Sequence, residues 1–261
     1  MIKAVIFDLD GLLIDSEPLW QEAEILIFQQ VNIVLNNKLC LQTKGLRIDE
    51  VVEYWYQKYP WTNMSKQEVE TAIVDKVIEL IFLKGKPLPG VDTAISFVRE
   101  KQVKMALASS SSLKIIQAAL KKLNLANVFA KVYSAESEKL GKPYPGVYLT
   151  TAENLGVAPQ TCLAIEDSLN GVLAAKAAQM KCIAIPEAAQ GNNSEAKLAP
   201  APFLKDTLKG SAVSLSGETP PTNCFTAWHN GGAGFLARFA IADKILRSLE
   251  ELDDEVWSSL S

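Results

Sequence analysis

Short apolar runs that alternate with stretches of helical periodicity constrain this fold more than any other feature of the sequence. The apolar runs have strand length and lie at residues 4–7, 103–108, 131–133, 162–165 and 182–185. Helical stretches accompany the later runs at residues 94–98, 113–123, 147–149 and 170–178. Strands that alternate with helices predict an α/β protein with a doubly wound parallel sheet. Ligands bind such a sheet beyond the carboxyl ends of its strands.

Two carboxylates follow the first apolar run directly. The unbroken run Ala4–Phe7 is typical of a strand that is buried on both faces of a sheet. Asp8 and Asp10 come next, and Gly11 allows a turn that a residue with a Cβ would resist. Like charges at the mouth of a buried strand are costly unless a cation or a reaction uses them. The sequence therefore predicts that the chemistry lies at this strand end.

Three further strand ends carry what a phosphate site needs. The run Ser109–Ser112 precedes a helix, where hydroxyl groups and unpaired backbone N–H groups bind anions. Lys142 lies in a turn after the next strand, and its ammonium can neutralise phosphate oxygens. Glu166 and Asp167 end a further strand. If the sheet brings Asp167 and the first aspartate pair to one edge, their oxygens form the kind of cluster that Mg²⁺ prefers.

The segment between residues 17 and 86 is predicted to be all helical. Apolar side chains recur at helical spacing over residues 20–31 and 51–55. Ser65 and Glu68 form a capping box at the start of a third helical stretch. A small helical domain inserted after the first strand explains this pattern.

The domain division follows from these boundaries. A linker with two prolines at residues 86–90 ends the helical segment. We expect a core domain of residues 1–16 and 87–261 around the inserted domain of residues 17–86. Within the core, residues 199–240 are rich in Pro, Gly, Ser and Asn, and we expect them to form an irregular insertion.

Composition and charge exclude several classes of function. The chain of 261 residues has a net charge of −4, which argues against nucleic acid or an anionic membrane as the main partner. No apolar stretch reaches the length of a membrane span, and we expect a cytoplasmic monomer. The four cysteines form no CxxC pair, so we expect free thiols and no zinc site. His229 is the only histidine, which nearly excludes a Ser-His-Asp or Cys-His mechanism.

Taken in order, the four strand ends resemble the four motifs of the haloacid dehalogenase superfamily. The matching residues are Asp8-x-Asp10-Gly11, Ser109, Lys142 and Glu166-Asp167. The inserted helical domain resembles the C1-type cap of that superfamily, which implies a Rossmann-like core beneath a cap. Segments 15–20, 45–49 and 107–109 resemble those of bacterial sugar phosphatases of the hexitol phosphatase type, also described as 2-deoxyglucose-6-phosphate phosphatases. The resemblance covers residues 1–198 and returns at 241–252.

The resemblance implies a reaction through a covalent intermediate. Asp8 would be the nucleophile and would form an aspartyl-phosphate that water hydrolyses. Asp10 would be the general acid towards the leaving sugar oxygen and then the general base towards the water. Ser109, the Ser110 amide and Lys142 would bind the transferring phosphoryl oxygens. Ser109 is also compatible with the role of an ordinary helix N-cap.

The resemblance also implies a Mg²⁺ site. The ion would be held by Asp8, the Asp10 carbonyl oxygen and Asp167. Glu166 would either add a further metal ligand or orient Lys142, and the sequence leaves both roles open.

These implications predict a Mg²⁺-dependent phosphatase of small phosphorylated sugars or sugar alcohols, such as hexose 6-phosphates. Arg47 is the candidate for substrate recognition in the cap, although a surface ion pair explains it equally well. One alternative function is a phosphosugar mutase of the β-phosphoglucomutase type, which shares the four motifs. Those mutases carry a histidine at the position that matches Trp20, so the tryptophan favours hydrolysis. A second alternative is a non-catalytic relative that acts by binding alone, although every catalytic position is occupied.

Overall fold

The computed structural model describes residues 1–186 and 238–261, and its centre is a parallel sheet of six described strands. The strands are β1 Ala4–Phe7, β2 Lys104–Ser109, β3 Lys131–Ser134, β4 Cys162–Glu166, β5 Lys181–Ala184 and β6 Lys244–Ile245. Their order is β3-β2-β1-β4-β5-β6, and every neighbouring pair is parallel. The strand order reverses direction between β1 and β4, as in a doubly wound sheet. The predicted fold class is confirmed.

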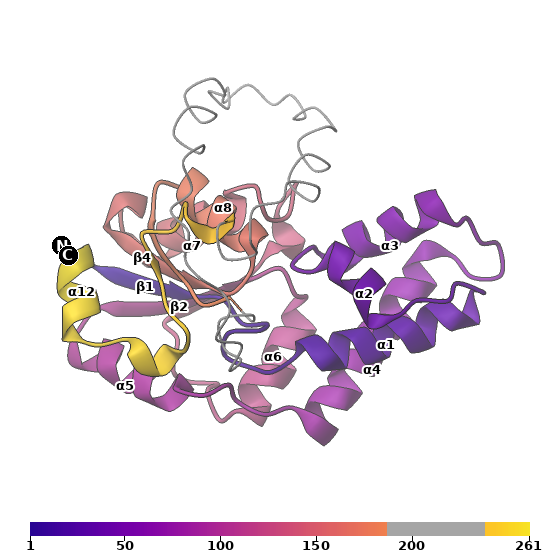
Figure 1. Ribbon diagram of the computed structural model, residues 1–261, viewed down its shortest axis with the longest axis horizontal. Helices are drawn as coiled ribbons and strands as arrows, with labels where there is room; N and C mark the ends of the chain where they lie inside the picture. The colour runs from indigo at the N-terminus through magenta and orange to yellow at the C-terminus, as the bar shows by residue number, and fades with distance from the viewer. Residues whose placement is uncertain (187–237) are drawn as a thin grey trace.

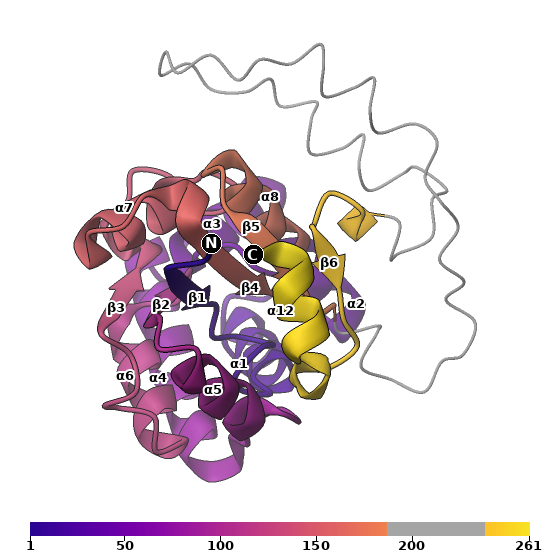
Figure 2. The same cartoon turned by 90° about the vertical axis from the view of Figure 1, so that its left-hand side faces the viewer.

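Helices cover both faces of this sheet, as Figure 1 and Figure 2 show. One face carries α5 Val91–Glu100, α6 Leu113–Lys122 and α12 Asp254–Leu260, and the other carries α7 Gly146–Leu155 and α8 Leu169–Ala177. Short 3₁₀ helices η2 Ala135–Ser137, η3 Pro159–Thr161 and η5 Leu249–Glu251 connect these elements.

The central strand β1 is buried on both faces because its side chains alternate between two hydrophobic layers. Val5 and Phe7 pack in the layer that contains α5, α6 and α12. Ala4 and Ile6 pack in the layer that contains α7 and α8. This double burial is the physical reason for the unbroken apolar run at the start of the sequence.

A lobe of helices lies beside the carboxyl edge of the sheet (Figure 1). This helical lobe consists of α1 Glu17–Gln30, α2 Asn37–Cys40, η1 Leu41–Thr43, α3 Ile48–Lys58 and α4 Lys66–Lys84. The predicted capping box starts α4: Ser65 N donates to Glu68 Oε2 at 2.7 Å, and Glu68 N donates to Ser65 Oγ at 3.2 Å. The sequence did not predict α2, because a single turn is too short to show periodicity.

Two neighbouring segments connect the helical lobe to the sheet. Asp15 N donates to the carbonyl oxygen of Lys86 at 3.0 Å, and Leu88 N donates to that of Leu13 at 3.2 Å. The chain therefore leaves and re-enters the core side by side, at one place. The domain boundaries themselves stay a prediction.

Several expectations concern parts of the chain that the structure describes only partly or not at all. Residues 199–237 of the predicted insertion, with His229 and Cys224, lie outside the described residues. The described end of that insertion includes Phe239, which is buried against the α7–α8 layer. Three described cysteines, Cys40, Cys162 and Cys182, are free and buried. No described helix has the length and apolar content needed to cross a bilayer, and the expected monomer and location stay predictions.

Candidate active site

The strand register brings the predicted residues to one edge of the sheet. Phe7 in β1 pairs with Leu107 in β2 and with Ile165 in β4. The backbone pairing extends one step further, since Asp8 N donates to the carbonyl oxygen of Ile165 at 3.0 Å. Asp8, directly after β1, and Glu166, the last residue of β4, therefore lie at the same level, because parallel strands in register end at one edge.

Three carboxylates and one ammonium form a buried cluster at this edge. Single oxygen atoms of Asp8, Glu166 and Asp167 lie within 4.8 Å of one another. Lys142 Nζ donates to Asp8 Oδ1 at 2.7 Å and to Glu166 Oε1 at 2.6 Å. The hydroxyl of Tyr148 donates to the same Glu166 oxygen at 2.5 Å. Asp8 is the most exposed of the four charged residues, at only 5%. Their charges therefore interact strongly, with little water to screen them.

Burial changes the proton affinity of these groups. It raises the pKa of Asp8 well above its ordinary value, a rise that Lys142 opposes and that the neighbouring carboxylates increase. Burial likewise raises the pKa of Asp167 to about 7, against the opposing charge of Lys44. Burial alone would lower the pKa of Lys142, but Asp8 and Glu166 hold it above its ordinary value. Burial, together with the neighbouring negative charges, therefore favours the neutral forms of Asp8 and Asp167.

The chemistry of this cluster fits a hard divalent cation. Three ionised carboxylates and one ammonium leave two negative charges, which one Mg²⁺ ion would balance. Asp8 and Asp167, two of the predicted ligands, belong to the cluster. Glu166 belongs to it as well, but its Oε1 atom also accepts hydrogen bonds from Lys142 and Tyr148. Both roles suggested for Glu166 are therefore compatible with the geometry.

Asp10 lies beside the cluster and is held by hydroxyl and indole donors. Its Oδ1 atom accepts from Ser16 Oγ at 2.7 Å and from Trp20 Nε1 at 2.9 Å. Its Oδ2 atom accepts from Ser111 Oγ at 2.6 Å and from Ser109 Oγ at 3.3 Å. These contacts orient the carboxyl group from both sides. The sequence places Ser111 in the anion-binding run Ser109–Ser112 and Trp20 at a position that favours hydrolysis, but it does not predict that either side chain would bind Asp10.

The loop after β1 requires its glycine. Gly11 has a positive φ of +72°, and a Cβ there would lie 2.3 Å from Asp167 Oδ2. The predicted need for Gly11 is thus explained both by backbone conformation and by the close approach of the cluster. The N-cap interpretation of Ser109 is wrong, because Ser109 ends β2 and the N-cap of α6 is Ser112.

The helical lobe contacts the core directly beside the cluster. Lys44 Nζ lies 3.0 Å from Asp167 Oδ2, so the lobe supplies a positive charge to a predicted metal ligand. Ser110 Oγ donates to the carbonyl oxygen of Gly45 at 3.0 Å. The sequence did not predict a role for Lys44, which lies three residues before Arg47.

Arg47 lies at the border between the lobe and the core. Its Nη1 atom donates to the carbonyl oxygens of Ala135 at 3.2 Å and Glu138 at 2.7 Å. Its Nη2 atom pairs with Asp49 at 2.8 Å. The guanidinium thus joins α3 to the loop after β3, and its role in substrate recognition stays a prediction.

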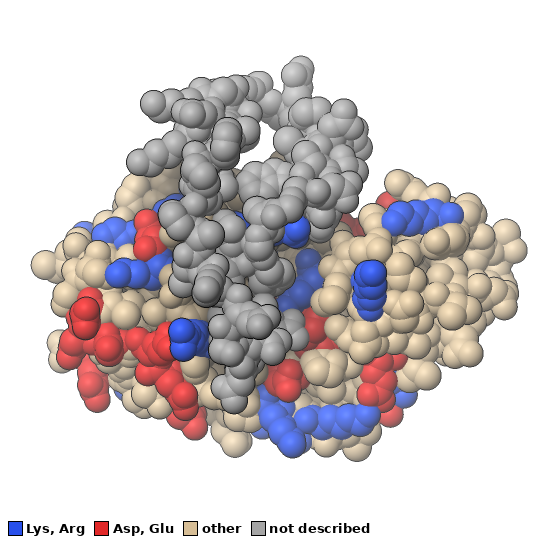
Figure 3. Space-filling view, viewed as in Figure 1, with Lys and Arg blue, Asp and Glu red and all other residues tan. Residues whose placement is uncertain are grey.

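One cavity between the lobe and the strand ends contains most of the predicted residues. Its lining includes Asp8, Asp10, Ser109, Ser110, Lys142 and Asp167. Glu166 and Arg47 are not among the described residues that line it. From the lobe, Trp20, Glu24 and Lys44 line the cavity. Figure 3 shows charged side chains of both signs in the recess between the two parts of the molecule.

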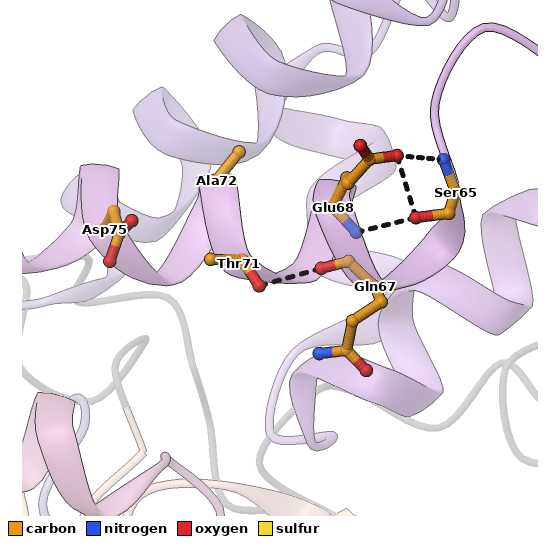
Figure 4. A pocket seen from close by; sticks show the side chains of 6 residues that line it. All are labelled: Ser65, Gln67, Glu68, Thr71, Ala72 and Asp75. Carbon is orange, nitrogen blue, oxygen red and sulfur yellow. Dashed lines mark hydrogen bonds between the residues drawn. The ribbon is translucent and has the colours of Figure 1, made fainter.

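Another hollow is lined by residues from Ser65 to Asp75 at the start of α4 (Figure 4), and none of the residues that line it also lines the cavity at the strand ends. Its polar side chains form local hydrogen bonds: Ser65 Oγ donates to Glu68 Oε2, and Thr71 Oγ1 donates to the backbone carbonyl oxygen of Gln67 at 2.8 Å. These contacts belong to the capped start of a helix, and they leave the cavity at the strand ends as the candidate active site.

Comparisons with known proteins support the same assignment. A family model described as "haloacid dehalogenase-like hydrolase" matches residues 2–179. Hexitol phosphatase B of Escherichia coli strain K12 is 43% identical over 186 residues, which cover 71% of this chain and 84% of that protein. The β-phosphoglucomutase of Bacillus subtilis strain 168 is 30% identical over 191 residues, covering 70% of this chain and 83% of the mutase.

A comparison of solved structures supports the fold alone. The crystal structure of CbbY from Rhodobacter sphaeroides, in complex with phosphate, has a TM-score of 0.72 and 21% sequence identity. The match covers 97% of this chain and 96% of that one, so the sheet and the helical lobe are both included.

Proposed function

Because this chain belongs to the haloacid dehalogenase-like hydrolase family, as an enzyme that hydrolyses phosphoric monoesters, we propose that it is a Mg²⁺-dependent phosphatase of small sugar or sugar-alcohol phosphates. Hexose 6-phosphates and hexitol phosphates are the proposed substrate class. The identity of 43% to hexitol phosphatase B supports this choice.

The contact of Lys142 with Asp8 inside the acidic cluster carries this proposal. A buried carboxylate 2.7 Å from a buried ammonium provides a nucleophile next to a group that binds phosphoryl oxygens. Asp167 and Glu166 add the negative charge that a cation would offset.

In the proposed reaction, an Asp8 carboxylate oxygen attacks phosphorus, and the bond from phosphorus to the sugar oxygen breaks. Asp10 gives its proton to that leaving oxygen. Asp10 then takes a proton from a water molecule, which attacks the aspartyl-phosphate, releases inorganic phosphate and restores Asp8. The bonds from Ser16 and Trp20 to Asp10 support this role, because they hold the carboxyl group in one orientation.

The remaining residues are proposed to bind charge. Asp8, Asp167 and the Asp10 carbonyl oxygen would hold Mg²⁺, which when bound would shield the phosphate so that an anionic nucleophile can approach. Lys142, Ser109 Oγ and the Ser110 amide would bind phosphoryl oxygens, where negative charge has to be stabilised.

Residues 17–86 are proposed to act as a cap that closes over the substrate and excludes water, on a core of residues 1–16 and 87–261. The pairing of Lys44 with Asp167 and the bond from Ser110 to Gly45 support a closed arrangement. Arg47 is proposed to assist substrate recognition from the cap border, where its guanidinium contacts the core.

A phosphosugar mutase is the second candidate, because β-phosphoglucomutase is among the relatives. Trp20 favours hydrolysis. Its indole N–H is a donor only and is bound to Asp10 at 2.9 Å, so it cannot accept a proton as the histidine at the matching position of those mutases can.

A phosphate-release screen over sugar phosphates, with Mg²⁺ and with a chelator, tests the proposal. We expect release from six-carbon sugar or sugar-alcohol phosphates that depends on Mg²⁺. Incubation with β-glucose 1-phosphate and a trace of the bisphosphate separates the two candidates. Formation of glucose 6-phosphate without free phosphate would establish the mutase instead.

A further inference from the structure

Glu24 is a buried carboxyl group that the proposed reaction does not use. It lies on α1, is 6% exposed, and lines the same cavity as Asp8 and Asp10. Its Oε2 atom has no hydrogen-bond partner among the described residues. A buried polar atom without a partner is costly, so its retention beside a cavity points to a ligand that completes it.

The surroundings of Glu24 favour a neutral carboxyl group. Burial raises the pKa of Glu24 to about 8, a hydrogen bond with the Cys40 thiol opposes the rise, and the charge of Glu17 adds to it. A protonated carboxyl group has one donor and spare acceptor capacity, as a sugar hydroxyl has. In the neutral form it also does not repel a phosphate dianion in the same cavity.

The position of Glu24 along α1 sets its distance from the reacting groups. Trp20 lies on the same helical face, four residues earlier, and its indole is bound to Asp10 at 2.9 Å. Four residues advance an α-helix by about 6 Å. Glu24 therefore lies about 6 Å further along α1 than the residue that binds Asp10, and it lines the same cavity.

We propose that Glu24 determines specificity for the polyol part of the substrate, by a hydrogen bond to a hydroxyl group remote from the phosphate. This inference rests on the proposed function and deepens it. It assigns the preference for six-carbon sugar and sugar-alcohol phosphates over shorter phosphate esters to one side chain of the cap.

Ligand binding to the Asp8→Asn protein tests this assignment without turnover. Calorimetry would compare glucitol 6-phosphate, glycerol 3-phosphate and inorganic phosphate, with Mg²⁺ present throughout. We expect Glu24→Leu to lower the affinity for glucitol 6-phosphate at least about tenfold. The affinities for the two smaller ligands should change less than about twofold. Glu24→Gln should change the affinity for glucitol 6-phosphate by less than about threefold, because an amide also donates and accepts hydrogen bonds.

Two controls separate recognition from packing. Glu22→Gln changes a carboxylate on the same helix that pairs with Lys84 on the surface, and it should alter none of the three affinities. Glu24→Met keeps the length of the side chain without its polar end, and it replaces the leucine variant if thermal unfolding shows that the latter does not fold. Glu24→Leu and Glu24→Met should lower the affinity for glucitol 6-phosphate by similar factors.

The outcomes distinguish this inference from the proposed function. If the apolar variants lower the affinity for all three ligands equally, or leave that for glucitol 6-phosphate unchanged, the role of Glu24 is overturned and the proposed function still stands. A parent protein that binds inorganic phosphate but no polyol phosphate overturns the proposed function, and the inference with it.

Discussion

The two walls of the cavity are built in different ways. The core wall, with Asp8, Lys142 and Asp167, consists of residues at strand ends and in the loop after β3. Asp8 pairs with Lys142, and Asp167 pairs with Lys44 of the helical lobe. The cap wall, with Trp20 and Glu24, consists of helix side chains, and one of its carboxyl oxygens is unpaired among the described residues. The carboxylates of the core wall thus each have a partner of opposite charge, whereas Glu24 of the cap wall keeps one carboxyl oxygen without a hydrogen-bond partner among the described residues.

This difference separates two tasks. Groups fixed by a sheet suit the phosphoryl transfer, which is the same for every substrate and needs preorganised charge. Side chains on helices of a separate lobe suit the recognition of the alcohol part, because they can vary while the sheet stays unchanged. Substitutions on the core wall should therefore affect all substrates alike, and those on the cap wall should affect some more than others.

The largest effect is expected for Asp8→Asn on the core wall. The amide is a poor nucleophile, so kcat should fall by about 10⁴-fold or more for every substrate. Asn keeps an oxygen that can accept from Lys142 Nζ, so the fold should persist. Phosphate release and circular dichroism measure the two effects. Activity above about one percent of the unchanged protein would contradict the nucleophile assignment.

Lys142→Met should impair both stability and catalysis. It leaves the carboxylates of Asp8 and Glu166 buried without their ammonium, which costs about 3–5 kcal/mol of unfolding free energy. The folded state then keeps protons that the unfolded state releases, so the loss should grow as pH rises from about 5 to 8. Urea unfolding at both pH values measures it. A pH-independent loss would show that packing, and not charge, dominates.

Addition of Mg²⁺ should stabilise the protein, and more so at high pH. Asp167 has a raised pKa of about 7, so its contribution to stability is present below its unfolded value near pH 4 and is lost as pH rises through 7. Mg²⁺ binds the ionised form. At a hundredfold excess over Kd it adds about 2.7 kcal/mol. The rise in melting temperature on addition of Mg²⁺ should be larger near pH 8 than near pH 5, and Asp167→Asn should reduce that rise.

Arg47→Met tests the border between the two walls. It removes hydrogen bonds to the carbonyl oxygens of Ala135 and Glu138, worth about 1–3 kcal/mol together. We expect KM to rise less than tenfold, with kcat changed less. Steady-state kinetics on two sugar phosphates measure both constants. A kcat that falls with an unchanged KM would place Arg47 in the chemical step instead.

The smallest effect is expected away from both walls, at the capping box of α4. Ser65→Ala removes the N-cap acceptor for Glu68 N and should cost about 1 kcal/mol of stability. Because Ser65 and Glu68 are exposed and do not line the cavity at the strand ends, kcat and KM should not change. Thermal unfolding and steady-state kinetics check the two statements. Altered kinetics would mean that a change at the capping box affects the cap residues that line the cavity.

The core wall could be predicted from the sequence to a large extent. Asp8, Ser109 and Asp167 follow apolar runs, and parallel strands end at one edge, so the pattern alone brings them together. The sequence did not show that Tyr148 would donate to Glu166, because a tyrosine on a helix is usually a packing residue.

The cap wall could be predicted only in outline. Helical spacing shows which residues share a face, but not whether that face meets the core, the solvent or a cavity. Glu24 interrupts an apolar face, which is a signal that could have been used. Lys44 follows the short 3₁₀ helix Leu41–Thr43, and such a segment has no periodicity from which its direction can be inferred.

The pairing of Lys44 with Asp167 links the position of the cap to the affinity of the acidic cluster for cations. A cap that swings outward on its two connecting segments withdraws an ammonium from the cluster, which then attracts a divalent ion more strongly. By thermodynamic reciprocity, an ion that binds there loosens the hold of the cluster on the cap. On this geometry, metal binding to the cluster and outward movement of the cap are coupled equilibria.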